Sequence, residues 1–477
     1  MTPPETALPL DPNTGSAAPA RLPASKLTLS EALASARETK ALIVGPGVLD
    51  RAPEVFRQQF PGRRAVVVAD DASFFVAGRA VSGSLRQSGL EAHPPFLFHD
   101  SNLYAEYRFV EILVESLRQH DAIPVAVGSG TINDLVKLAS HRTGRPYLCV
   151  ATAASMDGYT AFGASITFQG AKQTFDCPAP RAVIADLQVV CGAPSPMTAS
   201  GYADLQAKIT AGADWILADA LGAEPIDPRA WEIVQGSLAS ALADPAGART
   251  GQPSAIAPLI EGLMLGGFAM QWTRSSRPAS GAEHQFSHLW DMEHHTFNGE
   301  APSHGFKVGV ATLAVTALYE VLLERSFEKL DVSAQCARWP AAADTETHVR
   351  RIFATNDFLA TAVTETRAKH PTPEALRSQL ERLARGWPAL RARLRAQLVP
   401  HAELKQRMKR VGAPTEPEEI GITRQRLRDS FLRAYHIRRR FTVLDLAVRT
   451  GLLEESLDAL FGAGGIWPTY TPQTRST

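Results

Sequence analysis

The stretch AIPVAVGSGTIND, residues 122–134, decides the fold class of this 477-residue chain. Its first half is a short, unbroken apolar run, which is typical of a strand buried on both faces. The following TINDLVKLASHRTG (131–144) has helical spacing. Gly128 and Gly130 lie where the strand would turn into the helix. Glycines there let a phosphate approach the free N–H groups of a helix start, but they also serve simply to make the corner, and the third glycine of GxGxxG is missing.

Short apolar runs and helical segments alternate on both sides of this stretch. YRFVEILVESLRQHD (107–121) has helical spacing, and three further apolar runs are strand candidates: KALIVGPG (40–47), RRAVVVADD (63–71) and PYLCVAT (146–152). This alternation predicts a parallel sheet with right-handed crossovers. From about residue 195 the spacing is mostly helical. We therefore predict an α/β, Rossmann-like N-terminal domain followed by an all-helical C-terminal domain, with a site between them.

The chain divides into four segments on this pattern. Residues 1–25 are rich in Pro, Ala, Ser and Thr and are predicted to form a disordered leader. The Rossmann-like domain is placed at 26–195 and the helical domain at 196–465. Residues 466–477 are interpreted as a flexible tail.

The composition excludes several classes of protein. Lys and Arg together number 49, as do Asp and Glu, so the chain lacks the positive charge of a nucleic-acid-binding protein. The four cysteines are scattered without a CxxC pair, which argues against a disulfide framework or a thiolate zinc site. The sequence shows no signal peptide, and no apolar run reaches the roughly 18 residues of a membrane span. We expect a soluble protein of the reducing cytoplasm.

The basic stretch RQRLRDSFLRAYHIRRRFT (424–442) has two interpretations. It is amphipathic, so contact with RNA, a membrane surface or a phosphate is conceivable. Because the whole chain is neutral, a solvated helix face that pairs with acidic neighbours is the favoured interpretation.

Asp70 ends the apolar run RRAVVVAD and is a candidate nucleotide contact. An acidic side chain at such a strand end can accept hydrogen bonds from both hydroxyls of an adenosine ribose. It would repel a 2′-phosphate and so favours NAD over NADP. The alternative is a solvated loop aspartate beside Asp71.

Five of the thirteen histidines lie within SGAEHQFSHLWDMEHHTFNGEAPSHG (280–305), at positions 284, 288, 294, 295 and 304. His284 and His288 are four apart and would share one helix face. Both could bind one metal ion, or one could bind it while the other contacts the substrate. His304 precedes the next helix and could converge on them. The adjacent His294 and His295 would point about 100° apart on a helix and are interpreted as loop or helix-end residues.

A metal site of this kind also needs a carboxylate. Asp204 in GYADLQAK (201–208) lies in a helical pattern of small and apolar residues, with Lys208 one turn later. The pair is either an ordinary surface ion pair or a metal ligand with a cationic neighbour.

Five motifs in this order resemble the sn-glycerol-1-phosphate dehydrogenase family: GSGTIND, TAASMDGY, GYADLQAK, SGAEHQFSH and SHGFKVG. The resemblance covers about residues 40–323. The family belongs to a larger group that contains glycerol dehydrogenase, iron-containing alcohol dehydrogenases and dehydroquinate synthase. The resemblance therefore implies a dehydroquinate synthase-like architecture, a Rossmann-like domain followed by a helical one.

The resemblance implies a role for individual residues. Asp204, His284 and His304 match the family's metal ligands, and Asp204 is counted with the catalytic residues for that reason. His288 and Asp157 match residues on the substrate side. Asp70 matches the position that contacts the adenosine ribose. The rest of the dinucleotide site would be lined by Gly128, Gly130, Thr131, Ile132, Asn133, Asp134, Thr152 and Ser155.

The activity implied is a metal-dependent, NAD(H)-linked interconversion of dihydroxyacetone phosphate and sn-glycerol 1-phosphate. NAD is favoured with NADP as the alternative, and zinc or nickel is favoured over iron. Lys208 is a candidate contact for the substrate phosphate. The chain has Phe306 and Lys307 where the family usually has an acidic residue after His-Gly, which leaves the substrate open.

Two other activities stay open, a dehydrogenase of another small polyol or polyol phosphate and a dehydroquinate synthase-like lyase. The expected partner is a small-molecule substrate, with no nucleic acid and no membrane span, and we expect a homo-oligomer, a dimer for preference.

Overall fold

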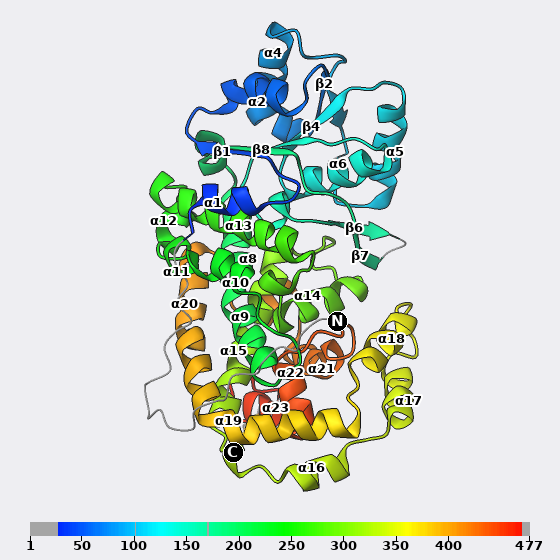
Figure 1. Ribbon diagram of the computed structural model, residues 1–477, viewed down its shortest axis with the longest axis vertical. Coiled ribbons are helices and arrows are strands. Elements are labelled where there is room, and N and C mark those ends of the chain that lie inside the picture. The colour runs from blue at the N-terminus through cyan, green and yellow to red at the C-terminus, as the bar shows by residue number, and fades with distance from the viewer. Residues whose placement is uncertain (1–26, 101, 169–170, 470–477) are drawn as a thin grey trace, which may run out of the picture.

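A six-stranded parallel sheet forms the core of the N-terminal part of the molecule, as predicted. The computed structural model describes residues 27–100, 102–168 and 171–469, and the sheet lies in its upper part in Figure 1. The strands run in the order β1-β8-β5-β4-β2-β3, and every neighbouring pair is parallel. Their bounds are β1 Ala41–Gly45, β2 Ala65–Asp70, β3 Phe96–Phe98, β4 Ile123–Gly128, β5 Leu148–Ala151 and β8 Ala182–Asp186.

Helices cover both faces of this sheet. Along β4, Val125 and Val127 pack with the side chains of α2 and α4, whereas Ala126 packs with those of α5 and α6. Because successive residues of a strand face opposite sides, covering both sides requires an unbroken apolar run. The helices and turns of this part are α2 Ala52–Gln59, α3 Asp71–Ser73, α4 Arg79–Gln87, α5 Tyr107–Arg118, α6 Gly130–Arg142 and α7 Leu187–Cys191, with η1 Leu49–Arg51, η2 Phe74–Gly78 and η3 Gly158–Thr160.

An antiparallel hairpin separates β5 from β8 in the chain. Its strands are β6 Ala164–Phe168 and β7 Ala171–Phe175, and it extends from the sheet region toward α14 of the helical part (Figure 1).

The rest of the described chain is helical, which confirms the predicted fold class. Its helices are α8 Ser195–Gln206, α9 Lys208–Ala220, α10 Pro228–Gln235, α11 Leu238–Ala241, α12 Pro245–Arg249, α13 Pro253–Thr273, α14 Ala282–Met292, α15 His304–Leu323, α16 Val332–Arg338, α17 Ala342–Ile352, α18 Leu359–Lys369, α19 Pro373–Gln397, α20 His401–Val411, α21 Arg424–Ala434, α22 Val443–Arg449 and α23 Leu453–Phe461, with η4 Arg277–Ala279, η5 Phe327–Lys329 and η6 Pro417–Ile420. α13 and α8 lie just below the sheet in Figure 1, and α8, α14 and α15 carry Asp204, His284 and His304.

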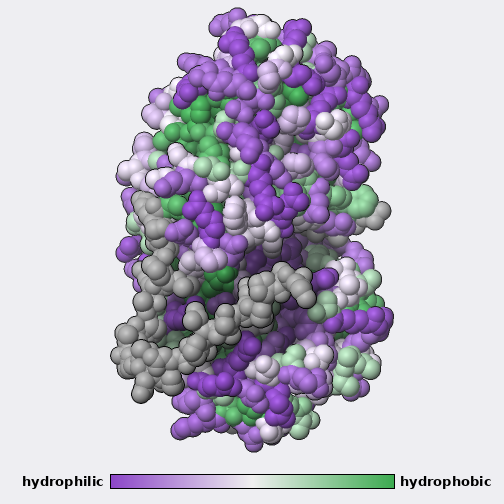
Figure 2. All heavy atoms as spheres, viewed as in Figure 1, coloured by the Kyte–Doolittle hydropathy of each residue, from purple (hydrophilic) through white to green (hydrophobic). Residues whose placement is uncertain are grey.

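Two of these helices are long and apolar enough to cross a membrane by length and composition alone. Of the most apolar window, 72% is buried inside the protein in α13 and 83% in α15. Core packing therefore accounts for their apolar character. The face of the molecule in Figure 2 is mostly hydrophilic, with hydrophobic residues scattered over it.

The domain boundaries stay a prediction. The short helix α1 Leu29–Ser35, which we assigned to the Rossmann-like domain, packs against α13, and Ala32 is buried in the core of the helical part. The predicted leader 1–25 lies outside the described residues, and so do residues 470–477 of the predicted tail.

Candidate active site

The carboxyl edge of the sheet brings the predicted dinucleotide residues together. From β2 the chain continues to β3 at one end of the sheet, whereas from β4 it continues to β5 on the other side. β2 and β4 are neighbours, so the chain leaves them in opposite directions and a crevice opens outside their carboxyl ends. Asp70 is the last residue of β2 and Gly128 the last residue of β4, so both lie at this switch point.

The carboxylate of Asp70 already has a structural role. Its Oδ1 accepts a hydrogen bond from the backbone N–H of Ser73 at 2.7 Å and so caps α3. The side chain is half-buried, and the neighbouring Asp71 carboxylate pairs with His99 at 2.9 Å. The structure places Asp70 where a ribose contact is expected, and that contact stays a prediction.

The two glycines of the GSG turn are needed for packing. A Cβ on Gly128 would lie 2.6 Å from Cβ of Ile132, and one on Gly130 would lie 2.9 Å from Cε of Met156. The strand and the helix therefore leave no room for a side chain at Gly128, whereas at Gly130 the end of the Met156 side chain would have to move. Thr152 follows β5 at the same edge, and its backbone N–H donates to the Gly128 carbonyl.

The other predicted dinucleotide residues mostly face the protein. Ile132 is fully buried in the core, Asn133 donates to the Gly158 carbonyl, and Asp134 accepts from the Ser165 backbone N–H. The Ser155 hydroxyl lies 3.3 Å from the Tyr159 hydroxyl. The Asn133 and Asp134 side chains hold the 158–165 segment against α6, so any contact that Ile132, Asn133 or Asp134 makes to a cofactor rests mainly on the backbone.

Asp204, His284 and His304 converge from three helices, α8, α14 and the first turn of α15. One ligand atom from each lies within 4.8 Å of the others, and Nε2 of His284 is 3.7 Å from Oδ1 of Asp204. The His284 and His304 ring centroids are 5.4 Å apart. One carboxylate and two imidazoles at this spacing fit a divalent transition-metal ion.

Glycines in the sequence motifs make this convergence possible. A Cβ on Gly201 would overlap the Ala154 carbonyl oxygen, and a Cβ on Gly305 would overlap the Ser200 carbonyl oxygen. The start of α15 can therefore lie directly on α8, and α8 directly on the loop after β5. This explains why the motifs GYAD and HG each pair a glycine with a site residue.

Lys208 lies under the candidate ligands and is fully buried. Its Nζ is 2.7 Å from Oδ2 of Asp157 and 2.8 Å from Oδ1 of Asp204, and the Asp157 backbone N–H donates to Oδ2 of Asp204 at 3.1 Å. The pair with Asp204 is thus not the surface ion pair considered above. A lysine held by two carboxylates is also not available to a substrate phosphate, so that suggestion is wrong.

The pKa values of the two aspartates shift in opposite directions. Burial alone would raise the pKa of Asp204, but Lys208, His304 and His284 outweigh it and hold that pKa well below its ordinary value. The pKa of Asp157 is raised, by burial first and then by the Asp204 carboxylate. Asp204 is therefore the stronger anion of the two, as a metal ligand requires.

Behind His284 lies a second buried layer that the sequence did not predict. Oε1 of Glu283 is 2.8 Å from Nδ1 of His284, and Oε2 of Glu283 accepts from the Thr210 hydroxyl at 2.8 Å. Deeper still, Asp214 accepts from the Tyr319 hydroxyl at 2.6 Å and from the Ala282 backbone N–H at 2.7 Å. Burial and then the Glu283 carboxylate raise the pKa of Asp214 to about 7.

Known proteins are similar to this chain in sequence and in fold. A family model described as iron-containing alcohol dehydrogenase matches residues 43–194. A glycerol-1-phosphate dehydrogenase (NAD(P)+) of Geobacillus thermodenitrificans is 31% identical over 386 residues, which cover 80% of this chain and 86% of the relative. The chain belongs to the glycerol-1-phosphate dehydrogenase family. It is an NAD(P)-dependent alcohol dehydrogenase and therefore an oxidoreductase.

Further relatives agree with this assignment. A glycerol-1-phosphate dehydrogenase (NAD(P)+) of Halalkalibacterium halodurans is 33% identical over 286 residues, 59% of this chain and 71% of the relative. Among solved structures, a probable glycerol dehydrogenase of Sinorhizobium meliloti superposes with a TM-score of 0.55 at 16% identity. It covers 88% of this chain and 97% of that one. At that identity the structural match supports the fold alone.

The remaining histidines of the 280–305 stretch separate into two groups in this family member. His288 is half-buried, with its ring centroid 6.4 Å from that of His284 and 6.5 Å from that of His304. His294 is exposed and lies 3.1 Å from Asp357. His295 is buried between the Ile420 carbonyl oxygen and the Arg426 guanidinium. The last two are structural, whereas His288 lies beside the candidate ligands.

Lys307, three residues after His304, has a local role in the contact between α14 and α15. It is buried in the first turns of α15 and pairs with Asp291 of α14. The pair connects the two helices that carry His284 and His304.

The basic helix α21 carries ion pairs, as the favoured interpretation required. Arg424 pairs with Glu418, Arg426 and Arg433 pair with Glu293, and Arg428 pairs with Glu454 and Asp458. The three arginines that follow this helix, 438–440, do not all conform to that pattern.

Proposed function

We propose that this chain is a metal-dependent, NAD(H)-linked dehydrogenase that interconverts dihydroxyacetone phosphate and sn-glycerol 1-phosphate. The observation that carries the proposal is the convergence of Asp204, His284 and His304 beside the carboxyl edge of a Rossmann-like sheet. The named relatives act on glycerol 1-phosphate with NAD(P)+, which makes a polyol phosphate the first substrate to test.

Asp204, His284 and His304 are the proposed metal ligands. A divalent ion bound there would supply Lewis acidity to the oxygen on the substrate's reacting carbon. The residues contribute what that chemistry needs: Asp204 a carboxylate that stays ionised beside Lys208, and His284 an imidazole oriented by Glu283. The donor set suits zinc, nickel or ferrous iron, and we favour zinc or nickel.

His288 and Asp157 are the proposed substrate-side residues. His288 lies about one helix turn from His284 on the same face, where its ring can hold the proton that the substrate oxygen gains on reduction. Asp157 lies 2.7 Å from Lys208 Nζ and is only partly covered, so its carboxylate can accept hydrogen bonds from substrate hydroxyls. Lys208 keeps this pair of aspartates from repelling the substrate.

The proposed dinucleotide site is the crevice at Asp70 and Gly128–Gly130. It includes Thr152 and Ser155 in the loop that follows β5. Nicotinamide supplies the hydride acceptor and donor of such reactions. The Asp70 carboxylate would repel a 2′-phosphate, so we propose a preference for NAD over NADP. The N–H groups at the start of α6 face the same edge and suit the pyrophosphate.

The subcellular site and assembly are also proposals. Cys149, Cys177, Cys191 and Cys336 are free thiols, which agrees with the reducing cytoplasm. A homodimer stays our expectation.

Two measurements separate the proposed activity from its alternatives. Consumption of NADH with dihydroxyacetone phosphate, and formation of the sn-1 enantiomer, support the proposal. Consumption of NADH only with other ketones would instead indicate a dehydrogenase of another polyol or polyol phosphate. Release of phosphate without net change in NADH would instead indicate a dehydroquinate synthase-like lyase.

A further inference from the structure

A cavity of about 870 Å³ lies in the helical part of the molecule, away from the candidate active site. Its walls are α18, the start of α19, the loop at 222–224 and the segment 437–441, and Arg449 of α22 also lines it. We name it the arginine cavity. None of the residues proposed for the metal, the substrate or the dinucleotide lines it. Its volume is that of a site for a small molecule.

Positive charge predominates in its lining. Two carboxylates, Glu224 and Glu365, face five cationic side chains, those of Lys369, Arg438, Arg439, Arg440 and Arg449. Three of the five cations have a carboxylate partner. Arg439 pairs with Glu365 at 2.6 Å, and Lys369 and Arg449 share the buried Asp445 at 3.0 and 3.2 Å.

Arg438 and Arg440 form no ion pair with a carboxylate of the described residues. The guanidinium of Arg440 donates to the Ser280 carbonyl oxygen at 2.6 Å and to the Ser276 hydroxyl at 2.8 Å, and both acceptors are neutral. Arg438 makes no hydrogen bond or ion pair with any residue that the structure describes, and the nearby Glu365 is already taken by Arg439. Both arginines are half-buried, so water screens their charges only in part.

The electrostatics of Arg440 reflect this excess of positive charge. Burial, followed by repulsion from Arg277 and Arg438, lowers the pKa of Arg440 to about 9, with Glu224 and Glu283 opposing the shift. Burial also lowers the pKa of Arg438, with Glu365 opposing it. An anion between the two guanidiniums would relieve both the burial cost and the repulsion.

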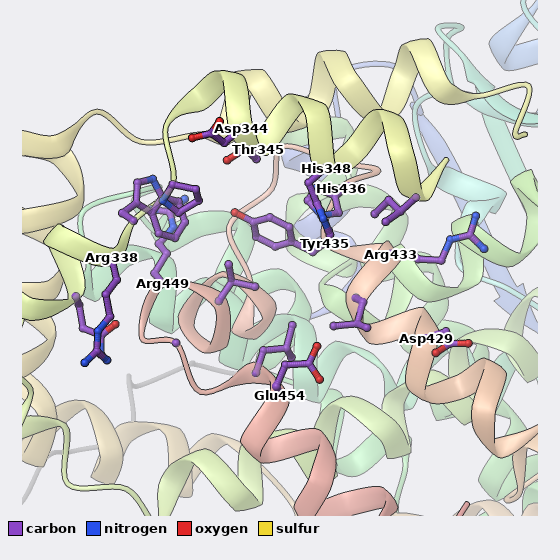
Figure 3. Close-up of a pocket in the computed structure, with 18 of the residues that line it drawn as sticks. Arg338, Asp344, Thr345, His348, Asp429, Arg433, Tyr435, His436, Arg449 and Glu454 are labelled. Carbon is purple, nitrogen blue, oxygen red and sulfur yellow. The ribbon is translucent and has the colours of Figure 1, made fainter. Parts of the chain in front are cut away.

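A neighbouring cavity provides the contrast. It has a volume of about 1030 Å³ and lies between α16, α17, α21 and α22 (Figure 3). Three arginines line it, Arg338, Arg433 and Arg449, against three carboxylates, Asp344, Asp429 and Glu454. Its lining charges balance, so an excess of cations is not a general property of cavities in this part of the fold. Arg449 lines both cavities.

We propose that the arginine cavity binds the phosphate group of a small metabolite between Arg438 and Arg440, at a site separate from the active site. Guanidinium forks match a phosphate in charge and geometry and bind it through paired N–H donors. The remaining volume would hold the organic part of the ligand. Free phosphate and a phosphate ester offer the same recognition chemistry.

The test is a calorimetric titration of the full-length protein with inorganic phosphate at fixed ionic strength. Arg438→Gln should weaken phosphate binding roughly tenfold or more, because it removes an unpaired charged donor. The matched control is Arg118→Gln in the last turn of α5. Arg118 is exposed and makes no hydrogen bond or ion pair with the described residues, so phosphate affinity should not change. Arg438→Lys, which keeps the charge but loses the fork, should give an intermediate affinity.

Three results would overturn the proposal. One is a phosphate affinity of Arg438→Gln within about twofold of the wild type, which is a difference in binding free energy below about 0.5 kcal/mol. Another is no binding of phosphate by the wild-type chain. The third is a loss of phosphate binding in His288→Asn together with unchanged binding in Arg438→Gln. That result would place the phosphate in the proposed active site. Because no turnover is measured, the outcome does not depend on the proposed function.

A second titration with glycerol 2-phosphate distinguishes the two sources of the phosphate group. Arg438→Gln should weaken this ligand as well. If the binding that Arg438→Gln removes is tighter for the ester than for phosphate, the occupant is a phosphorylated metabolite, and the reverse order would identify free phosphate. A glycerol 2-phosphate affinity that Arg438→Gln leaves unchanged contradicts the proposal for esters.

Discussion

Nδ1 of His284 lies 2.8 Å from Oε1 of Glu283, so the other ring nitrogen, Nε2, is the one that faces Asp204. A carboxylate behind an imidazole fixes the orientation of the ring and raises its basicity toward a metal. Glu283 is held in turn by the Thr210 hydroxyl and the Gly281 backbone N–H. Glu283 is therefore a positioning residue that acts through His284.

Glu283→Gln should therefore weaken the binding of the metal, by roughly 10–100-fold. The measurement is a competition between the protein and a chelating indicator. Glu111→Gln, on the exposed side of α5, is the matched control and should bind the metal like the wild type. Equal metal affinity in Glu283→Gln and wild type would show that the contact has no role in orienting His284.

Lys208→Met should destabilise the metal-free protein by about 3–5 kcal/mol, because it leaves Asp157 and Asp204 buried without their cation. Urea unfolding, followed by circular dichroism, measures the loss. Lys409→Met on the exposed face of α20 should change stability by less than about 0.5 kcal/mol. A Lys208→Met protein as stable as that control would mean that the aspartates do not depend on Lys208.

Gly305→Ala should disrupt the contact between α15 and α8, since the new Cβ overlaps the Ser200 carbonyl oxygen. The displacement would carry His304 away from Asp204, so metal content and thermal stability should fall together. Gly386→Ala tests the reverse case, because Gly386 lies in α19 with open space around it. That change should leave stability unchanged or raise it by about 0.4–1 kcal/mol. Retention of metal by Gly305→Ala would contradict the packing argument.

Stability should fall as the pH is lowered from about 6.5 toward 4, in part through His401. Burial, with Lys405 adding to it and Glu416 opposing, lowers the pKa of His401 to about 4. A histidine with a lowered folded pKa binds its proton in the unfolded state first, so acid favours unfolding by up to about 1.4 kcal/mol per pH unit for this group. His401→Gln should reduce the slope of unfolding free energy against pH in this window. His141→Gln, at an exposed position, should leave it in place.

The sequence was most informative about elements formed by contiguous residues. The apolar run 122–127 predicted β4 because both faces of a parallel strand are covered, and the GSG turn after it lies at the sheet edge where it was expected. His284, His288 and His304 could be grouped because they share one short stretch, and Asp204 joined them through the family resemblance. Confirmation of the fold does not extend to the roles of these residues, which stay predictions.

The sequence could not predict contacts between distant segments. Asp214 meets Tyr319 and the backbone of Val443 across 105 and 229 positions, and no local pattern marks such pairs. Glu283 had a weak local signal, an acidic residue directly before a candidate ligand histidine, which orients that ring once α14 forms. The sequence could not predict the excess positive charge of the arginine cavity. Arg438 and Arg440 belong to a basic stretch whose other arginines are mostly paired, and no local pattern distinguishes the two from those.

The most direct test of the central claim compares wild type with His284→Ala and His288→Ala for bound metal, NADH binding and NADH consumption with dihydroxyacetone phosphate. His284→Ala should lose metal and turnover together while NADH still binds, and His288→Ala should keep the metal and lose turnover. Full activity in a demonstrably metal-free His284→Ala protein would contradict the assignment of Asp204, His284 and His304 as the metal site.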